Sequence, residues 1–111
     1  MPTYLVTLNA SAGLYQAMIK DPEDREDLTR QNVGRLDGKL LGYYYGNGNK
    51  VYMLAEFPDT AALYTVITAV FATGGAVDMD VVELFTSREM AAVCKAIPEK
   101  FGDYSPKLAE D

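Results

Sequence analysis

The fold of this chain is decided by one stretch, residues 40–57, which read LLGYYYGNGNKVYMLAEF. Two runs of strand-forming residues, 40–45 and 51–57, flank a segment of Gly and Asn at positions 46–49. Both residue types tolerate positive φ angles, so the segment can reverse the chain and make the stretch a β-hairpin. Strands with one face in water alternate apolar and polar residues, but only Glu56 is charged within these two runs. We therefore expect helices to bury one face and a second copy of the chain to bury the other.

Composition limits the classes of function. The chain has 111 residues and a net charge of −6, with a cluster of acidic residues at positions 21–27. We expect one domain over residues 1–98, followed by a tail at 99–111. The negative charge disfavours nucleic acid as a partner. The sequence contains no histidine, which excludes histidine-bound metals and histidine-ligated haem, so we expect neither a metal nor a cofactor.

The sequence leads us to expect a cytoplasmic protein with no membrane partner. Its first residues show no basic region and no long apolar segment of the kind found in signal peptides. Residues 60–77 carry no charge, but four threonines, a tyrosine and a Gly-Gly pair make them too polar to cross a membrane. The single cysteine, Cys94, occupies an apolar helical stripe, and we expect it to be a buried, inert thiol.

Hydrophobic periodicity predicts the elements before the hairpin. Residues 3–9 alternate as a strand, and Ser11 is a plausible cap for a first helix. Asp21-Pro22 then begins a second helix, with Asp as its cap and Pro at its first position. That helix carries Leu28 and Leu36 with few other apolar residues, so we expect it to be an exposed surface helix.

After the hairpin, Pro58-Asp59 opens a long helix that Gly74-Gly75 ends. A strand follows over residues 76–85, with one apolar side and one mixed side. The apolar side is predicted to carry Val77, Met79, Val81 and Phe85, and the mixed side Asp78, Asp80, Val82 and Leu84. Thr86 and Glu89 fit a capping box for a last helix that Pro98 stops. The order β-α-β-β-α-β with an extra C-terminal helix predicts an α+β, ferredoxin-like fold.

In this fold one face of the sheet carries the helices, and polar residues gather on the other. The first and last strands are neighbours, which would bring Thr7 and Asn9 beside Asp78 and Asp80. The two carboxylates would lie about 7 Å apart, a spacing compatible with ligand binding or acid–base chemistry. Alternatively, they face a wet cleft mouth or pair with Lys or Arg across a dimer.

The hairpin supplies further candidates for ligand binding. An aromatic or quinone-like substrate could be oriented by ring stacking and phenol hydrogen bonds from Tyr43, Tyr44, Tyr45 and Tyr52, although tyrosines of this kind also serve cores and interfaces. Asn47, in the turn, could cap a cavity and hold an anion, and the alternative is simple turn chemistry.

Nearly all of residues 3–96 resembles the GYD-domain family, small bacterial proteins of dimeric α/β-barrel type. The matching pieces are Tyr4-Leu5-Val6, Gly13-Leu14, Gly38-Lys39-Leu40, Tyr43-Tyr44-Tyr45, Pro58-Asp59, Gly75-Ala76-Val77, and Leu84 with Thr86, Glu89 and Met90. The name-giving Gly-x-Tyr-Asp is replaced here by Asn47-Gly48-Asn49-Lys50. The resemblance implies a dimeric α/β barrel. Similar barrels include cofactor-independent monooxygenases, isomerases and cyclases, haem enzymes and ligand-sensing modules, so the fold alone does not select a function.

The sequence thus predicts a homodimer that binds a small aromatic or polyketide-like metabolite between two sheets. Such a protein could be a cofactor-independent enzyme of monooxygenase, isomerase or cyclase type, using tyrosine, asparagine and aspartate. The alternative is a non-catalytic oligomeric interaction or regulatory module. A deep cavity with polar groups would favour the first hypothesis, and an interior filled by side chains the second.

Overall fold

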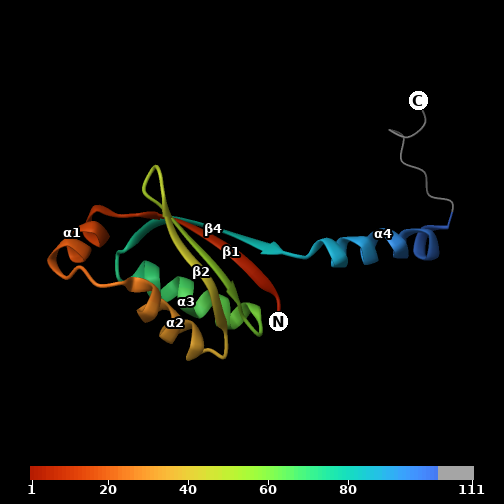
Figure 1. Ribbon diagram of the computed structural model, residues 1–111, viewed down its shortest axis with the longest axis horizontal. Coiled ribbons are helices and arrows are strands. Elements are labelled where there is room, and N and C mark those ends of the chain that lie inside the picture. The colour runs from red at the N-terminus through yellow and green to blue at the C-terminus, as the bar shows by residue number, and fades with distance from the viewer. Residues whose placement is uncertain (103–111) are drawn as a thin grey trace.

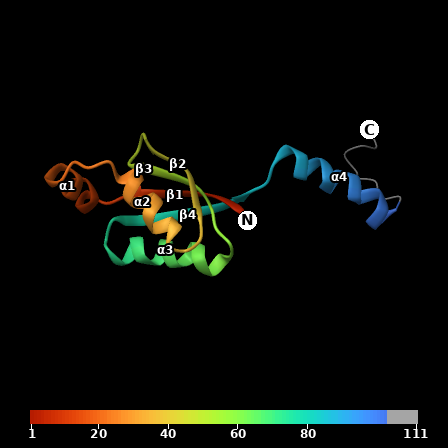
Figure 2. The ribbon, with the colours of Figure 1, turned by 60° about the horizontal axis from the view of Figure 1, so that its bottom comes forward.

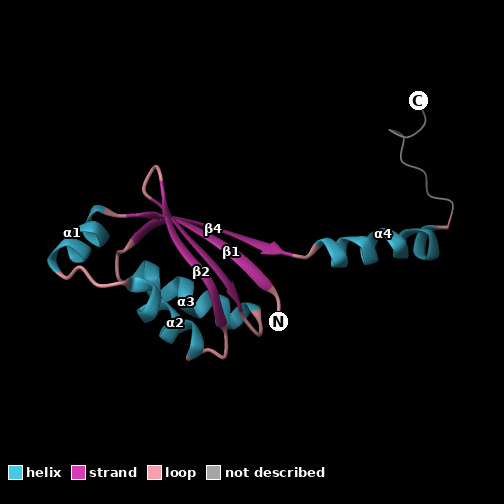
Figure 3. Cartoon of the chain, in the orientation of Figure 1, coloured by secondary structure: helices cyan, strands magenta, loops and turns pink. Residues whose placement is uncertain are grey.

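The computed structural model describes residues 1–102, which form four strands and four helices (Figures 1 and 3). In chain order the elements are β1 (Thr3–Ala10), α1 (Ala12–Lys20), α2 (Arg25–Gly34), β2 (Lys39–Gly46), β3 (Lys50–Glu56), α3 (Thr60–Ala72), β4 (Ala76–Leu84) and α4 (Ser87–Phe101). Most of the predicted tail, residues 103–111, lies outside the described residues. Within the described part, no helix is both long and apolar enough to span a membrane.

The strands form one antiparallel sheet in the order β2-β3-β1-β4. Helices α2 and α3 lie side by side on one face of the sheet, and no helix of residues 1–102 covers the opposite face (Figure 2). This is the α+β, ferredoxin-like arrangement that the sequence predicts, with the first helical connection divided into α1 and α2.

The predicted hairpin is confirmed as the pair β2 and β3. Its turn contains Gly48 and Asn49 at φ angles of 76° and 61°, the left-handed region that Gly and Asn tolerate. Along β3, Met53 and Ala55 point into the core under the helices, whereas Leu54 between them faces the open side of the sheet and is half-buried. The period of two therefore separates adjacent residues onto two different surfaces.

Helix α2 differs from its prediction in two ways. It begins at Arg25 and not at Asp21-Pro22, because Asp24 is the cap and its Oδ1 accepts a hydrogen bond of 2.9 Å from the Glu26 amide. The helix is also no mere surface helix, since Val33 is fully buried in the core between helix and sheet.

The predicted phase of β4 is correct for most of the strand. Met79 and Val81 pack against the core, while Asp78 and Asp80 lie on the open face. Two apolar residues do not follow the prediction. Val77 is 68% exposed, because a register irregularity between Asn9 and Ala10 places Ala76 in the buried position. Phe85 lies beyond the end of the strand and is 57% exposed.

Helix α4 extends away from the sheet and the other helices (Figures 1 and 2). The capping box of Thr86 and Glu89 is confirmed at its start. Pro98 does not stop this helix, because the Gly102 amide still bonds to the Pro98 carbonyl at 3.0 Å and closes the last turn. Cys94 is exposed and not buried as predicted, since α4 projects away from the core that was expected to cover it.

The projection of α4 also explains why the chain is elongated (Figure 1). The radius of gyration is 18.6 Å, whereas a compact chain of this size would have about 13 Å. The strands with α1, α2 and α3 therefore form the compact body, and α4 is an arm attached to it through the end of β4 (Figure 1).

Candidate functional site

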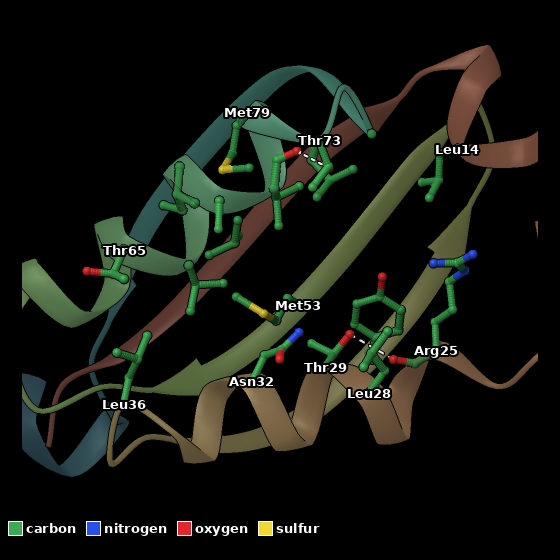
Figure 4. Close-up of a pocket in the computed structure, with 18 of the residues that line it drawn as sticks. Leu14, Arg25, Leu28, Thr29, Asn32, Leu36, Met53, Thr65, Thr73 and Met79 are labelled. Atoms are coloured by element: carbon green, nitrogen blue, oxygen red, sulfur yellow. Dashed lines mark hydrogen bonds between the residues drawn. The ribbon is translucent and has the colours of Figure 1, made fainter. Parts of the chain in front are cut away.

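A partly open cavity of about 460 Å³ lies between the sheet and helices α2 and α3 (Figure 4). Strands β1, β2, β3 and β4 supply its floor, and the two helices supply its walls. The lining residues from the strands are Val6, Leu8, Tyr43, Met53 and Met79, and those from α3 are Thr65, Val66, Ile67, Ala69 and Val70. Most of this surface is apolar.

Helix α2 contributes one face to the cavity. Arg25, Leu28, Thr29 and Asn32 lie at positions i, i+3, i+4 and i+7 of the helix, a spacing that keeps them on one side. Leu36, just beyond the helix, completes this wall. The polar members of the set therefore face the same space as the apolar ones.

The threonines of the cavity wall use their hydroxyl hydrogens locally. Thr29 donates to the Arg25 carbonyl at 2.8 Å, Thr65 to the Ala61 carbonyl at 2.7 Å, and Thr73 to the Val70 carbonyl at 2.6 Å. Such bonds to the same helix leave mainly the methyl groups to face a ligand. The threonines consequently make the wall less polar than their number suggests.

Arg25 is the most unusual polar residue of the lining. Its Nε is buried and has no hydrogen-bond partner. Buried donors are nearly always paired, and leaving one unpaired is destabilising. The Arg25 side chain lies at the end of the cavity near Leu14, opposite Leu36 and Thr65 (Figure 4).

Two tyrosines of β2 lie near this end of the cavity. The rings of Tyr43 and Tyr45 are in edge-to-face contact with centroids 5.6 Å apart, and the Tyr45 hydroxyl lies 3.9 Å from the Met18 sulfur. Partial burial raises the pKa of Tyr45, the Tyr43 phenol raises it further, and the Arg25 guanidinium opposes the rise. Tyr45 therefore stays protonated at neutral pH and is suited to donate a hydrogen bond, not to act as a base.

The predicted polar cluster lies on the other face of the sheet. Thr7 pairs with Asp80 and Asn9 with Asp78 across β1 and β4, and the Asn9 Nδ2 donates to the Asp78 Oδ2 at 3.2 Å. Both aspartates are exposed in the single chain. The four residues thus share one face as their spacing indicates, and their role in ligand binding stays a prediction.

The structure does not bring the predicted site together as one cluster. Tyr43 and Tyr45 lie on the helix side of the sheet, because the pairing of β2 with β3 places Tyr43 opposite Met53 and Tyr45 opposite Val51. These tyrosines therefore lie apart from the aspartates, and their role in ligand binding stays a prediction. Asn47 is exposed in the hairpin turn, away from the residues that line the cavity.

Sequence reasoning missed the residues that α2 directs into the cavity. The signal that could have found them is the helical spacing of Arg25, Leu28, Thr29 and Asn32, which resembles an apolar stripe with polar members. A cluster of three or more possible metal ligands of the His, Cys, Asp and Glu types is not found among residues 1–102.

These features define an α+β protein of ferredoxin-like fold with a cavity between its sheet and its helices. Two solved structures are similar to it. One is an uncharacterised NIPSNAP domain protein from Burkholderia xenovorans, with 14% identity, a TM-score of 0.50, and 78% of this chain and 95% of that chain covered. The other is a protein from Agrobacterium tumefaciens, with 15% identity, a TM-score of 0.50, and 79% and 95% covered.

At this level of identity the two likenesses support the fold and nothing finer. No family model matches the chain. No curated protein matches it either. The ferredoxin-like fold is thus established, and the resemblance to the GYD-domain family is not confirmed.

Proposed function

We propose that this protein binds a small, largely apolar metabolite in the cavity between the sheet and helices α2 and α3. The observation that carries the proposal is the cavity itself. Its volume of about 460 Å³ lies within the range of small-molecule sites, and its wall combines apolar side chains with a few polar groups. The sequence predicted a ligand between two sheets, whereas the cavity of the single chain lies on the face of the sheet that the helices cover.

Binding is better supported than catalysis. The hypothesis of an enzyme that uses tyrosine, asparagine and aspartate together requires one shared site, but Tyr43 and Tyr45 at the cavity lie on the face opposite Asp78 and Asp80. Tyr44 and Tyr52 share the open face with the aspartates, away from the cavity. This end of the cavity carries the Arg25 guanidinium, and the raised pKa of the nearby Tyr45 disfavours the phenolate that a general base would require. Such a set is suited to holding a ligand rather than to removing a proton from it.

A mutation that fills the cavity tests this proposal. Thr29 lies on the wall, whereas Gln31 on the same helix is exposed and lies outside the lining. The probe is the neutral aromatic compound 2-naphthamide, and calorimetry measures its binding. We expect it to bind saturably to the wild type and to the control variant Gln31→Trp, in which Thr29 is unchanged. Thr29→Trp should weaken this binding at least ~10-fold, because the indole occupies the space of the ligand.

Two outcomes would contradict the proposal. Equal affinities of Thr29→Trp and Gln31→Trp for 2-naphthamide would indicate that the compound binds outside the cavity. If neither 2-naphthamide nor its carboxylate analogue, 2-naphthoate, binds to the wild type, and native mass spectrometry finds no copurified small molecule, the interaction module becomes the better hypothesis.

We also propose that the protein is a homodimer in which the open face of the sheet is covered by a second copy. Val82 and Leu84 on this face are 51% and 38% exposed in the single chain, and Tyr44 is 63% exposed. Apolar side chains gathered on one face are typical of an interaction surface. The same partner could cover α4, on which Met90 and Val93 are 46% and 54% exposed.

Sedimentation velocity at low micromolar concentration tests the dimer. Val82 and Glu83 are adjacent on β4 and point to opposite sides of the sheet. We expect the wild type and Glu83→Arg to sediment as dimers and Val82→Arg as a monomer, because an arginine in an apolar interface loses its hydration without a partner. A monomeric wild type would overturn this part of the proposal.

A further inference from the structure

We infer that the ligand of the cavity carries a carboxylate or an equally small oxyanion, held at the end of the cavity where Arg25 lies. This inference rests on the proposed function, since it names the chemical class of the molecule that the same cavity binds. The remainder of the ligand is apolar and lies toward Leu36.

The first support is the sign of the charge. The chain as a whole carries a net charge of −6, yet the charged side chains that line the cavity are Arg25 and Arg35, and no Asp or Glu is among the described lining residues. A cavity with two cations in an acidic protein is opposite in sign to its surroundings. Its local field favours an anion over a neutral molecule or a cation.

The second support is the supply of hydrogen-bond donors. The hydroxyls of Thr29, Thr65 and Thr73 donate to their own helices. The Asn32 Oδ1 accepts a hydrogen bond of 3.3 Å from Arg35, and the amide nitrogen of Asn32 carries two further hydrogens. The donors that these side chains leave for a ligand are therefore the guanidinium groups of Arg25 and Arg35 and the Asn32 amide, which complement a ligand that accepts.

The third support comes from Arg25 itself. Among residues 1–102 the salt bridges of α2 are made by Arg30, which pairs with Glu26 and Asp27 at 3.5 Å, and Arg25 makes none. The buried Arg25 Nε also has no hydrogen-bond partner. A carboxylate at this end of the cavity would pair with the Arg25 guanidinium, which has no acidic partner among residues 1–102.

The surroundings of Arg25 select a ligand with one small charged end. Leu14 and Leu28 line the cavity beside Arg25 (Figure 4), and the nearby Tyr45 is an uncharged phenol whose pKa is raised by burial. A ligand with several charges would leave some of them unpaired against this apolar wall. An aromatic or aliphatic monocarboxylate satisfies both the donor and the apolar surface.

A matched pair of ligands and a matched pair of variants test the inference. Sodium 2-naphthoate and neutral 2-naphthamide share one ring system, and calorimetry with the full chain near neutral pH measures both affinities. We expect the wild type to bind the carboxylate about 10- to 100-fold more tightly than the amide, the range typical of a hydrogen bond to a charged group. Arg25→Gln should remove this preference by weakening naphthoate alone.

Arg30→Gln is the control, because it removes one positive charge from the same helix at an exposed residue that does not line the cavity. It should retain the preference for naphthoate. If Arg25→Gln fails to fold, Arg25→Lys keeps the charge while losing the Nε donor, and we expect it to show an intermediate preference.

The outcomes separate this inference from the proposed function. Equal affinity of the wild type for both compounds would overturn the inference and leave ligand binding intact. A preference for naphthoate that survives in Arg25→Gln would overturn the role of Arg25. Binding of neither compound would overturn the inference, and if native mass spectrometry also finds no copurified small molecule, the proposed function is overturned with it.

Discussion

The two faces of the sheet differ in what covers them, although the same four strands build both. The helix face is closed over a core that includes Val6 and Met53, and it also contains the cavity with Arg25 at one end. The open face carries Asp78 and Asp80 beside apolar residues and has no helix over it. In the single chain, the helix face therefore forms the hydrophobic core and the cavity, whereas the open face is exposed.

In this fold, adjacent residues of one strand can lie in the core and on the surface although both are apolar. Met53 is 6% exposed, and its neighbour Leu54 lies on the opposite face. Both residues are apolar, so composition alone does not distinguish them. Their surroundings differ because helices α2 and α3 pack on one side only.

The largest expected effect comes from truncating this adjacent pair. We expect Met53→Ala to lower the free energy of unfolding by about 2–5 kcal/mol, since it leaves a cavity in the core. Leu54→Ala should cost about 1 kcal/mol or less in the single chain. Urea unfolding followed by circular dichroism measures both values.

Repeating the urea experiment at two protein concentrations sharpens the comparison. A loss for Leu54→Ala that grows with protein concentration relative to the wild type would indicate that a second copy covers the open face. If Met53→Ala and Leu54→Ala lower the free energy of unfolding equally at every concentration, the proposed difference between the two faces is contradicted.

A smaller effect is expected at Gly38, between α2 and β2, where an added side chain has little room. A Cβ added to Gly38 would lie 2.7 Å from the Glu56 carbonyl oxygen and 2.9 Å from the Val33 Cγ1. Gly38→Ala should therefore destabilise the protein by about 1–3 kcal/mol. Gly34→Ala is the control, because a Cβ there meets nothing within 4 Å, and it should be neutral or stabilising by up to about 1 kcal/mol. Thermal unfolding of both variants checks the contrast, and equal destabilisation would contradict it.

The smallest effect concerns pH and the helix face of β2. The pKa of Tyr45 is raised, so the folded protein holds this proton more tightly than the unfolded chain. Stability from this source is present below about pH 10, the ordinary value for tyrosine, and falls as the pH rises further. The wild type should thus lose more stability between neutral and alkaline pH than Tyr45→Phe does.

Unfolding measured across this pH range checks the prediction. Tyr44→Phe removes a phenol from the open face of the same strand and serves as the matched control. An identical pH dependence for the wild type and Tyr45→Phe would contradict it.

The elements of the fold were predictable where local chemistry decides. The hairpin turn at Gly48 and Asn49 and the capping box of Thr86 and Glu89 appear as expected, because each depends on backbone preferences of neighbouring residues. The phase of Asp78 and Asp80 followed from simple alternation. The start of α2 was mistaken, since Asp21 and Asp24 offer competing caps and the sequence alone does not rank them.

The candidate site was less predictable, because it depends on contacts between distant residues. Tyr43 and Tyr45 could have faced either side until their partners Met53 and Val51 were known. Arg25 looked like part of a solvated helix, and only the packing of α2 on the sheet turned it toward a cavity. Cys94 belongs to an apolar stripe, but the direction of α4 left it exposed.

By itself, the sequence determined the order of strands and helices, the hairpin and the ferredoxin-like class, because periodicity and turn chemistry act over a few residues. Only the tertiary structure decided which face the helices cover, that a cavity remains between them and the sheet, and that Arg25 turns into it with an unpaired donor. The physical reason is that these features depend on how elements far apart in the chain fill space against one another.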